Sequence, residues 1–246
     1  MTTILKITGI IIISFMMNFN TEVYAQNKKA PVRVLVFTGG HGFDPEFEAF
    51  KQSLSGCIVT EVAHPNALKM FRPENRASFD VVLFYDLCKT ISEQEKKDFL
   101  DCVNKGKGLV VLHHAYVSYT EWPEYQKIIG GIWKYQPWTD HNGVSYPASS
   151  YIHNVQFRVK IANRKHPVTK GIEDFDIIDE TYKDGCVNPD VHVLLTTDEP
   201  TSTPSVAWTN RYGKSKVVTI LLGHDQQAWN NPSFQKLVTQ AIMWVK

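Results

Sequence analysis

The chain has 246 residues, of which 43% are hydrophobic and 21% charged, and its formal net charge at pH 7 is +1. A chain of this length can bury one large core without disulfide bonds. The near-neutral charge lacks the basic field with which proteins bind nucleic acids, so we expect no nucleic-acid partner.

The first 25 residues have the pattern of a secretory signal peptide. Lys6 precedes an apolar run of roughly ten residues, too short to span a bilayer, and Val23-Tyr24-Ala25 suits cleavage. We therefore expect residues 1–25 to be removed and the protein to be exported, periplasmic or secreted, with no membrane association afterwards. Residues 26–31 are then a short tail, and residues 32–246 a single domain.

The four cysteines do not form a C-x-x-C pair. Export permits disulfides, but Cys57, Cys88 and Cys102 lie in or beside predicted core elements. We favour free thiols. Cys88 follows a predicted strand and is the thiol nearest the expected crevice, which makes it an alternative nucleophile.

Apolar runs alternate with amphipathic segments in the first half of the chain. This alternation predicts an α/β fold with parallel strands and right-handed crossovers. Ser92 followed by Glu95 is a capping-box signal for a helix start. The predicted strands are 32–38, 57–62, 81–85 and 108–112, and the predicted helices are 44–54 and 92–104.

The pattern changes after residue 118. Residues 119–150 are rich in Trp, Tyr, Gly and Pro, and we expect a short helix near 122–130 followed by a long aromatic loop. Such a loop is commonly a lid or binding wall, so we expect Trp122–Tyr146 to line the ligand crevice. The remaining predicted elements are an edge antiparallel strand at 151–161, strands at 191–196, 205–209 and 216–222, and a helix at 232–245.

Three histidines follow buried strands: His41, His113 and His224. The carboxyl ends of parallel strands open into one crevice, so these side chains should converge. They suit either a divalent metal such as zinc, with all three as ligands, or an acid/base cluster. His114 neighbours His113, and only one of the two is expected to face the crevice.

Other residues near these strand ends are candidates for the same site. Asp179 and Glu180 follow an apolar pair at an expected strand end, and Glu180 would serve as general base or metal ligand. We expect His166 to be a structural residue of a loop. We take His41, His113, Glu180 and His224 as catalytic candidates. The candidate substrate-binding residues are Gly40, Asp44, His114, Trp133, Tyr182, Asp225 and Trp229.

Several common catalytic motifs are missing. The sequence has no G-x-S-x-G or G-x-C-x-G elbow, no Walker loop and no G-x-G-x-x-G after the first strand. Acyl transfer through a serine or cysteine elbow therefore lacks its nucleophile.

Five segments of the chain carry a family resemblance: V-F-T-G-G-H-G-F-D, G-K-G-L-V-V-L-H-H-A, H-P-V-T-K-G-I-E-D-F-D-I-I-D-E-T-Y, S-V-A-W-T-N-R-Y-G-K-S-K-V-V and L-L-G-H-D. Together they resemble the ThuA-like (trehalose utilization) family, which is similar in fold to class I glutamine amidotransferases. The resemblance implies a flavodoxin-like three-layer sandwich with a mostly parallel central sheet. His113 stands at the amidotransferase elbow and His224 at the later histidine, and the missing cysteine argues against amidotransferase chemistry.

The resemblance also implies a small carbohydrate ligand, such as trehalose, a related disaccharide or a 3-keto derivative. Two hypotheses follow. The protein is a glycoside or keto-sugar hydrolase, lyase or isomerase with a His/Glu site, or it is a non-catalytic carbohydrate-binding protein. The sequence leaves the sugar, the metal and any homo-oligomer open.

Overall fold

The computed structural model describes residues 30–42, 45–140 and 142–246, and Pro31–Lys246 form one compact unit. The predicted signal peptide, most of the short tail and Asp44 lie outside the described residues. Among the helices of the described part of the chain, none has the length and apolar character needed to cross a membrane.

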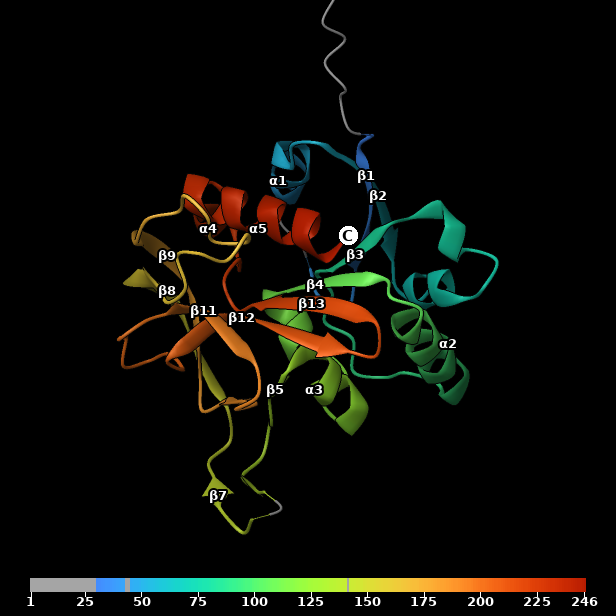
Figure 1. The fold of residues 1–246 in the computed structure, drawn as a ribbon. Helices are drawn as coiled ribbons and strands as arrows, with labels where there is room; N and C mark the ends of the chain where they lie inside the picture. The colour runs from blue at the N-terminus through green and yellow to red at the C-terminus, as the bar shows by residue number, and fades with distance from the viewer. Residues whose placement is uncertain (1–29, 43–44, 141) are drawn as a thin grey trace, which may run out of the picture. The chain divides into compact units, whose positions relative to one another are not determined.

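Nine strands of the described residues form one sheet, in the order β2-β1-β3-β4-β13-β12-β11-β8-β9 (Figure 1). The first five in this order pair in parallel, and the others antiparallel. The predicted α/β sandwich is confirmed. Its sheet is mixed, and four of the five parallel strands come from the N-terminal half of the chain. The strands are β1 (Val32–Thr38), β2 (Cys57–Ala63), β3 (Val81–Phe84), β4 (Gly108–Leu112), β8 (Ser150–Ile161), β9 (Phe175–Lys183), β11 (His192–Thr196), β12 (Ser205–Tyr212) and β13 (Ser215–Ile220).

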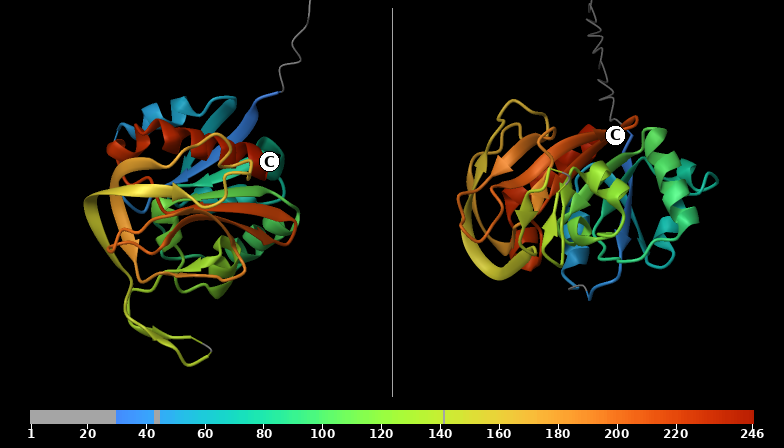
Figure 2. Two further views of the ribbon diagram at one scale, coloured as in Figure 1. Left: turned by 60° about the vertical axis from the view of Figure 1, so that its left-hand side comes forward. Right: turned by 90° about the horizontal axis from the view of Figure 1, so that it is seen from below.

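Helices cover both faces of the sheet, and each face has its own core. Val34 and Val36 of β1 belong to the core under α1, α4 and α5, whereas Leu35 and Phe37 belong to the core under α2 and α3. Figures 1 and 2 show these helices on opposite sides of the sheet. Because successive strand residues point to opposite faces, a strand buried on both faces is apolar throughout. The helices are α1 (Phe47–Ser53), α2 (Glu93–Asn104), α3 (Pro123–Ile129), α4 (Gln226–Trp229) and α5 (Pro232–Val245).

The predicted capping box begins α2. Ser92 Oγ accepts a hydrogen bond from Glu95 N at 3.3 Å, and Glu95 Oε2 accepts one from Ser92 N at 2.9 Å. The two residues therefore satisfy backbone donors that the first turn of a helix leaves free.

One strand differs from the sequence prediction. Asp179 and Glu180 lie inside β9, which continues to Lys183, rather than at a strand end. Both carboxylates are buried, at 2% and 5% exposure, and both have polar partners there. Buried carboxylates within a strand are tolerated when they have polar partners. The hydrophobic pattern of the sequence does not show such partners, so it predicted a strand end here.

The predicted aromatic loop contains short elements. The structure places η3 (His113–Val117) before it, and two short strands, β6 (Trp138–Thr139) and β7 (Ser145–Tyr146), form a hairpin within it. Figure 1 and the left view of Figure 2 show this hairpin projecting from the rest of the domain. The other short elements are η1 (Ala67–Phe71), η2 (Arg76–Ser78), β5 (Gly131–Ile132) and β10 (Cys186–Val187).

Candidate active site

A sharp turn at His113 ends β4. His113 has a φ of 40°, in the left-handed region that non-glycine residues rarely adopt. The side chain is fully buried, and its Nδ1 donates a hydrogen bond to the Leu221 carbonyl, just after β13, at 2.6 Å. In the neutral imidazole the lone pair therefore lies on Nε2. That atom accepts a hydrogen bond from the Tyr182 hydroxyl at 3.0 Å and also lies 3.1 Å from His224 Nδ1.

Glu180 reaches the same point from β9 and meets three imidazoles. Its Oε2 lies 2.6 Å from His153 Nδ1 and 3.3 Å from His224 Nδ1. Its Oε1 lies 3.5 Å from His113 Nε2. Burial raises the pKa of Glu180, while nearby His224 and His153 oppose that shift. The carboxyl group is thus placed to exchange protons with its histidine neighbours.

The neighbouring carboxylate, Asp179, holds the turn that carries His224. Asp179 Oδ2 accepts a hydrogen bond from Gly223 N at 2.7 Å, and Oδ1 accepts one from His224 N at 2.9 Å. Gly223 has a φ of 113°, which an L side chain rarely adopts. Burial raises the pKa of Asp179 to about 7, and the backbone N–H groups oppose the rise. Asp179 is therefore a positioning residue for His224.

His114 and His41 form the other side of the cluster. Their rings stack with centroids 4.4 Å apart. His114 is 4% exposed, and its Nδ1 is buried with no hydrogen-bond partner among the described residues. Burial and neighbouring histidines lower the pKa of both His114 and His113, to about 3 for His113. Both imidazoles are consequently neutral at physiological pH.

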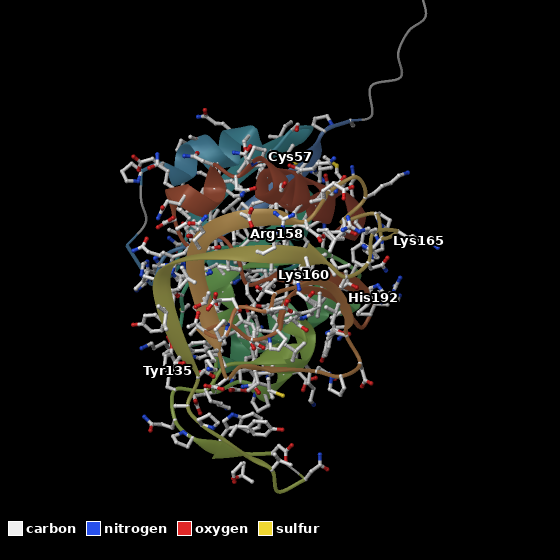
Figure 3. All side chains as sticks on the ribbon, turned by 90° about the vertical axis from the view of Figure 1, so that its left-hand side faces the viewer. Cys57, Tyr135, Arg158, Lys160, Lys165 and His192 are labelled. Carbon is white, nitrogen blue, oxygen red and sulfur yellow. The ribbon has the colours of Figure 1, made fainter. Side chains whose placement is uncertain are left out.

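A cavity of about 260 Å³ opens onto these groups. Histidines, Glu180 and Lys89 contribute polar groups to its lining, and aromatic rings provide much of the rest. Figure 3 shows one of these aromatic residues, Tyr135, near the base of the projecting hairpin. Apolar walls with a few convergent polar groups are typical of small-molecule sites. The lining residues are His41, Leu87, Lys89, His114, Val117, Trp133, Tyr135, Tyr151, His153, Glu180, Tyr182 and His224.

Two overlapping sets of described residues have metal-ligand geometry, with ligand atoms within 4.8 Å of one another. One set is His113, His114 and His224, and the other is His153, Glu180 and His224. Neutral imidazoles, a carboxylate and the orphaned Nδ1 of His114 fit a divalent cation such as zinc. The predicted set of His41, His113 and His224 differs from both, because the His41 ring stacks on His114 instead of joining either set.

The structure thus brings together the predicted histidines. His113 Nε2 lies 3.1 Å from His224 Nδ1, and the His114 ring lies 5.2 Å from that of His224. The expected convergence of the strand-end histidines is confirmed. Both members of the His113–His114 pair join the cluster, contrary to the expected alternation, because the chain leaves strand geometry at His113 and enters η3. Glu180, Trp133 and Tyr182 are also at the cavity.

Three proposed substrate-binding residues do not line this cavity. Asp225 caps α4, where its side chain accepts a hydrogen bond from Gln227 N at 2.8 Å. Trp229 is 2% exposed and packs in the core against Tyr85. Gly40 lies against the Leu87 carbonyl, where a Cβ atom would come within 1.8 Å of the oxygen. Each residue supports the fold beside the site instead of facing the cavity.

The aromatic segment is only partly a wall of the cavity. Trp133 and Tyr135 line it. Trp122 packs in the core against Phe99, and Trp138 stacks on Tyr146 in the hairpin, beside a separate cavity of about 1000 Å³. The predicted wall is therefore confirmed for Trp133 and Tyr135 but not for Trp122 or Trp138, since a helix and a hairpin divide the segment.

His153 and Tyr151 are site residues that the sequence interpretation missed. Both lie near the start of β8, which pairs with β9 so that Ile152 is opposite Thr181 and Val155 opposite Asp179. A register irregularity between these pairs lies at His153. The strand itself was predicted, but its partner and register, which place His153 beside Glu180, are tertiary features.

Comparisons with known proteins match one family model and several solved structures of similar fold. A family model described as trehalose utilisation matches residues 33–245. The fold is similar to that of a ThuA-like protein from Parabacteroides merdae, with a TM-score of 0.73, 19% identity, and coverage of 87% of this chain and 90% of that one. A ThuA-like protein from Bacteroides uniformis gives a TM-score of 0.66 at 19% identity, with 88% and 92% covered.

A cytoplasmic protein from Salmonella typhimurium is also similar in fold, with a TM-score of 0.59 at 12% identity and coverage of 87% and 99%. These identities establish likeness of fold. A search among curated proteins found no match.

Proposed function

Because the chain belongs to the trehalose utilisation (ThuA) family, which supports a carbohydrate-related role, we propose that it is an exported enzyme that removes a proton next to the carbonyl of a keto-glycoside. The observation that carries this proposal is the buried carboxyl group of Glu180 in contact with three imidazoles beside the cavity.

The composition of the cavity favours proton abstraction over ordinary glycoside hydrolysis. Glycosidases generally use two carboxyl groups that flank the scissile bond. Among the described lining residues, Glu180 is the only carboxylate. The second nearby carboxylate, Asp179, is engaged by backbone N–H groups of the His224 turn. A single base surrounded by imidazoles suits a carbon acid better.

In the proposed reaction, Glu180 accepts the proton from the carbon next to the ketone. For a 3-keto glycoside, the electron pair of that C–H bond forms a C=C bond and the glycosidic C–O bond breaks. The departing alcohol oxygen takes a proton from the ring N–H of His153, and the proton held by Glu180 replaces it. His153, which is half exposed and bonded to Glu180, then exchanges the proton with solvent. Elimination therefore needs one base and one acid, both present at this point.

A divalent cation fits the same residues. His113, His114 and His224, or His153, Glu180 and His224, would hold it. Such a cation would polarise the substrate carbonyl and so acidify the neighbouring C–H bond.

The aromatic walls would hold the sugar. Trp133 and Tyr182 rings lie 4.9 Å apart, and Tyr151 is 57% exposed at the cavity. Sugar rings present C–H faces that pack on such rings. The same walls serve the alternative hypothesis, a carbohydrate-binding protein without turnover, so the experiment must detect chemistry separately from binding.

The test is exchange of the proton next to the ketone in D₂O, followed by ¹H NMR with a methyl 3-keto-glucoside. This exchange reports proton abstraction even if the leaving group does not depart. We expect the mature protein to catalyse it and Glu180→Gln to reduce the rate by about 10²–10⁴-fold, the usual contribution of a general base.

Asp176→Asn is the matched control. Asp176 lies on the same strand but is exposed and paired with Arg158, so this variant should keep the wild-type rate. Binding of the sugar without any exchange would favour the carbohydrate-binding alternative. Equal exchange rates for Glu180→Gln and wild type would show that Glu180 is not the base.

A further inference from the structure

A second cavity, of about 1000 Å³, lies beside the projecting β6–β7 hairpin. The hairpin forms one wall, and α3, β5, β10 and the loop after β10 form the other (Figure 1). This volume is at the upper end of the roughly 300–1,000 Å³ that is typical of ligand pockets. The histidine cavity, at about 260 Å³, falls just below that range. The second cavity therefore has room for a larger ligand than the histidine cavity admits.

The segment that connects β5 to β6 separates the two cavities. Ile132 and Trp138 line the second cavity, whereas Trp133 and Tyr135 line the histidine cavity. In an extended chain, neighbouring side chains point to opposite sides, so one segment can serve as a wall for two cavities. The two sets of lining residues share no member. The second cavity is thus a separate place on the molecule.

The wall opposite the hairpin is fixed to the core of the domain. β5 and β10 pair so that Cys186 is opposite Ile132. The hydroxyl of Tyr116, a fully buried residue, donates a hydrogen bond to the Ile132 carbonyl at 2.8 Å. Asn188 N donates to the Gly130 carbonyl at 3.0 Å. This wall is therefore a rigid part of the fold, which lowers the entropic cost of binding a ligand against it.

The hairpin presents an aromatic pair to the cavity. Trp138 and Tyr146 are opposite each other in β6 and β7, and their rings stack with centroids 4.7 Å apart and 16° between the planes. Asp140 holds the turn between the two strands, since its Oδ1 accepts hydrogen bonds from Asn142 N at 2.9 Å and Val144 N at 2.8 Å. Both aromatic residues are only partly buried. They offer an apolar surface on which the C–H faces of sugar rings can pack.

Carboxylate and amide side chains provide polar groups around this aromatic pair. Asp140 and Asn142 belong to the hairpin, Gln126 to α3, and Asn188 and Asp190 to the loop after β10. Asn188 Oδ1 accepts a hydrogen bond from Asp190 N at 3.0 Å, which fixes the shape of that loop. Carboxylates accept hydrogen bonds, and amides both donate and accept them. This combination suits sugar hydroxyls, which also do both.

The charges of the lining favour a neutral ligand. Asp140 and Asp190 are acidic. Among the described lining residues there is one lysine, Lys127, and it pairs with Glu124 at 3.0 Å. An acidic glycan would therefore meet charge of its own sign in this cavity.

A second copy of the chain is a poorer occupant of the cavity. The strands β6 and β7 have two residues each, whereas a stable protein interface buries about 1,200–2,000 Å² in total. Val144, an exposed large aliphatic residue of the hairpin, is not part of the lining. The hairpin therefore offers little apolar surface for an interface at this point.

We propose that the second cavity binds a neutral oligosaccharide of two or more pyranose rings. The rings pack on Trp138 and Tyr146, and the hydroxyls bond to polar groups of the opposite wall such as Asp190. The carbohydrate-related role of the family favours this class of ligand. The site goes beyond the function proposed for the histidine cavity and does not depend on it.

The experiment follows the six tryptophans of the full mature chain, labelled as 5-fluorotryptophan, by ¹⁹F NMR during titration with maltotriose or cellotriose. We expect the Trp138 resonance, assigned by its loss in Trp138→Phe, to shift in a saturable manner. Trp208 and Trp229 are 0% and 2% exposed, so their unchanged resonances report an intact fold. Trigalacturonic acid, which is anionic, should bind at least about tenfold more weakly than the neutral trisaccharides. Tighter binding of the acidic trisaccharide would contradict the proposal.

Asp190→Ala tests the polar wall without altering the hairpin. We expect it to weaken trisaccharide binding about tenfold, because hydrogen bonds to charged groups are among the stronger ones. Asp198→Ala is the matched control, since Asp198 is an exposed carboxylate that pairs with Lys160 and lies outside this lining. This control should bind as the wild type does. Equal affinities for Asp190→Ala and wild type would contradict the proposed placement of the sugar.

The position of the shifted resonance separates this proposal from the function proposed for the histidine cavity. A shift of Trp133 alone would place the sugar in the histidine cavity, which overturns the second site and supports that function. A shift of Trp138 in a protein that fails the exchange test in D₂O supports the second site by itself. No shift of either resonance overturns the proposal, and a dimeric mass by light scattering would then assign the hairpin to an interface between copies.

Discussion

His113 Nε2 lies 3.1 Å from His224 Nδ1, although 111 residues separate the two in the chain. The contact exists because β4 and β13 are adjacent parallel strands, with Leu112 opposite Ile220. Each histidine follows the end of its strand, so the parallel pairing brings both to one edge of the sheet. Glu180 then reaches this pair from the antiparallel part of the sheet, at the far edge strand β9.

His224→Ala should abolish activity while leaving the fold nearly unchanged. The side chain is partly exposed at the end of a loop, so its truncation leaves little cavity. We expect activity to fall about 10²–10⁴-fold, with a change in Tm of only a few degrees. Turnover and Tm are measured together, with His192→Ala as a surface control (Figure 3). A fully active but unstable variant would assign His224 to the scaffold.

Asp179→Asn should impair both stability and activity. The amide retains one acceptor oxygen but loses the charge that binds the Gly223 and His224 N–H groups. We expect a loss of about 1–3 kcal/mol in the free energy of unfolding, measured by urea denaturation, and a lower kcat because His224 is displaced. Asp176→Asn on the same strand serves as control. If kcat stays at the wild-type value, Asp179 does not position His224.

His113 should make the protein less stable as the pH falls below neutral. Burial, followed by nearby His224, lowers the folded-state pKa of His113 to about 3 from 6.5. Between these values the unfolded chain binds more protons, so the stabilising contribution is present above pH 6.5 and declines toward pH 3. From pH 6.5 to pH 5 this amounts to about 2 kcal/mol for one histidine.

The variant His113→Asn isolates this effect, because asparagine tolerates a left-handed φ and retains a donor for Leu221. Asp179 acts in the opposite direction, since its pKa is raised to about 7 by burial. The measured quantity is therefore the difference in unfolding free energy between wild type and variant at pH 7 and pH 5. A loss equal in both proteins would show that His113 does not titrate as described.

The histidine cluster should bind a divalent metal. We expect elemental analysis of the mature protein to find about one divalent ion, such as zinc, per chain. His114→Phe removes the orphaned Nδ1, and it should reduce metal content without changing the stack with His41. If wild type and His114→Phe hold equal amounts, the ion binds elsewhere or through the set of His153, Glu180 and His224.

The exported protein should begin at Gln26. This follows from the predicted signal peptide at residues 1–25. N-terminal sequencing of protein recovered from the periplasm or medium checks it, with the cytoplasmic fraction as comparison. Material that begins at Met1 would place the protein inside the cell. One protein of similar fold, from Salmonella typhimurium, is named as a cytoplasmic protein.

The sequence by itself determined the α/β fold, the parallel strands of the N-terminal half and the convergence of the histidines. Local chemistry is sufficient for these features. Continuous apolar runs indicate strands buried on both faces, the Ser92–Glu95 pair starts a helix, and a histidine after such a strand belongs to the carboxyl edge.

Only the tertiary structure decided which groups complete the site. His153 lies beside Glu180 because β8 and β9 pair with a register irregularity, and no local pattern specifies a register between distant strands. Trp229 and Asp225 follow His224 in sequence, yet one fills the core and the other caps α4. The contact between His64 and Asp86 likewise joins the segments that follow β2 and β3, and their separate positions in the sequence do not reveal it.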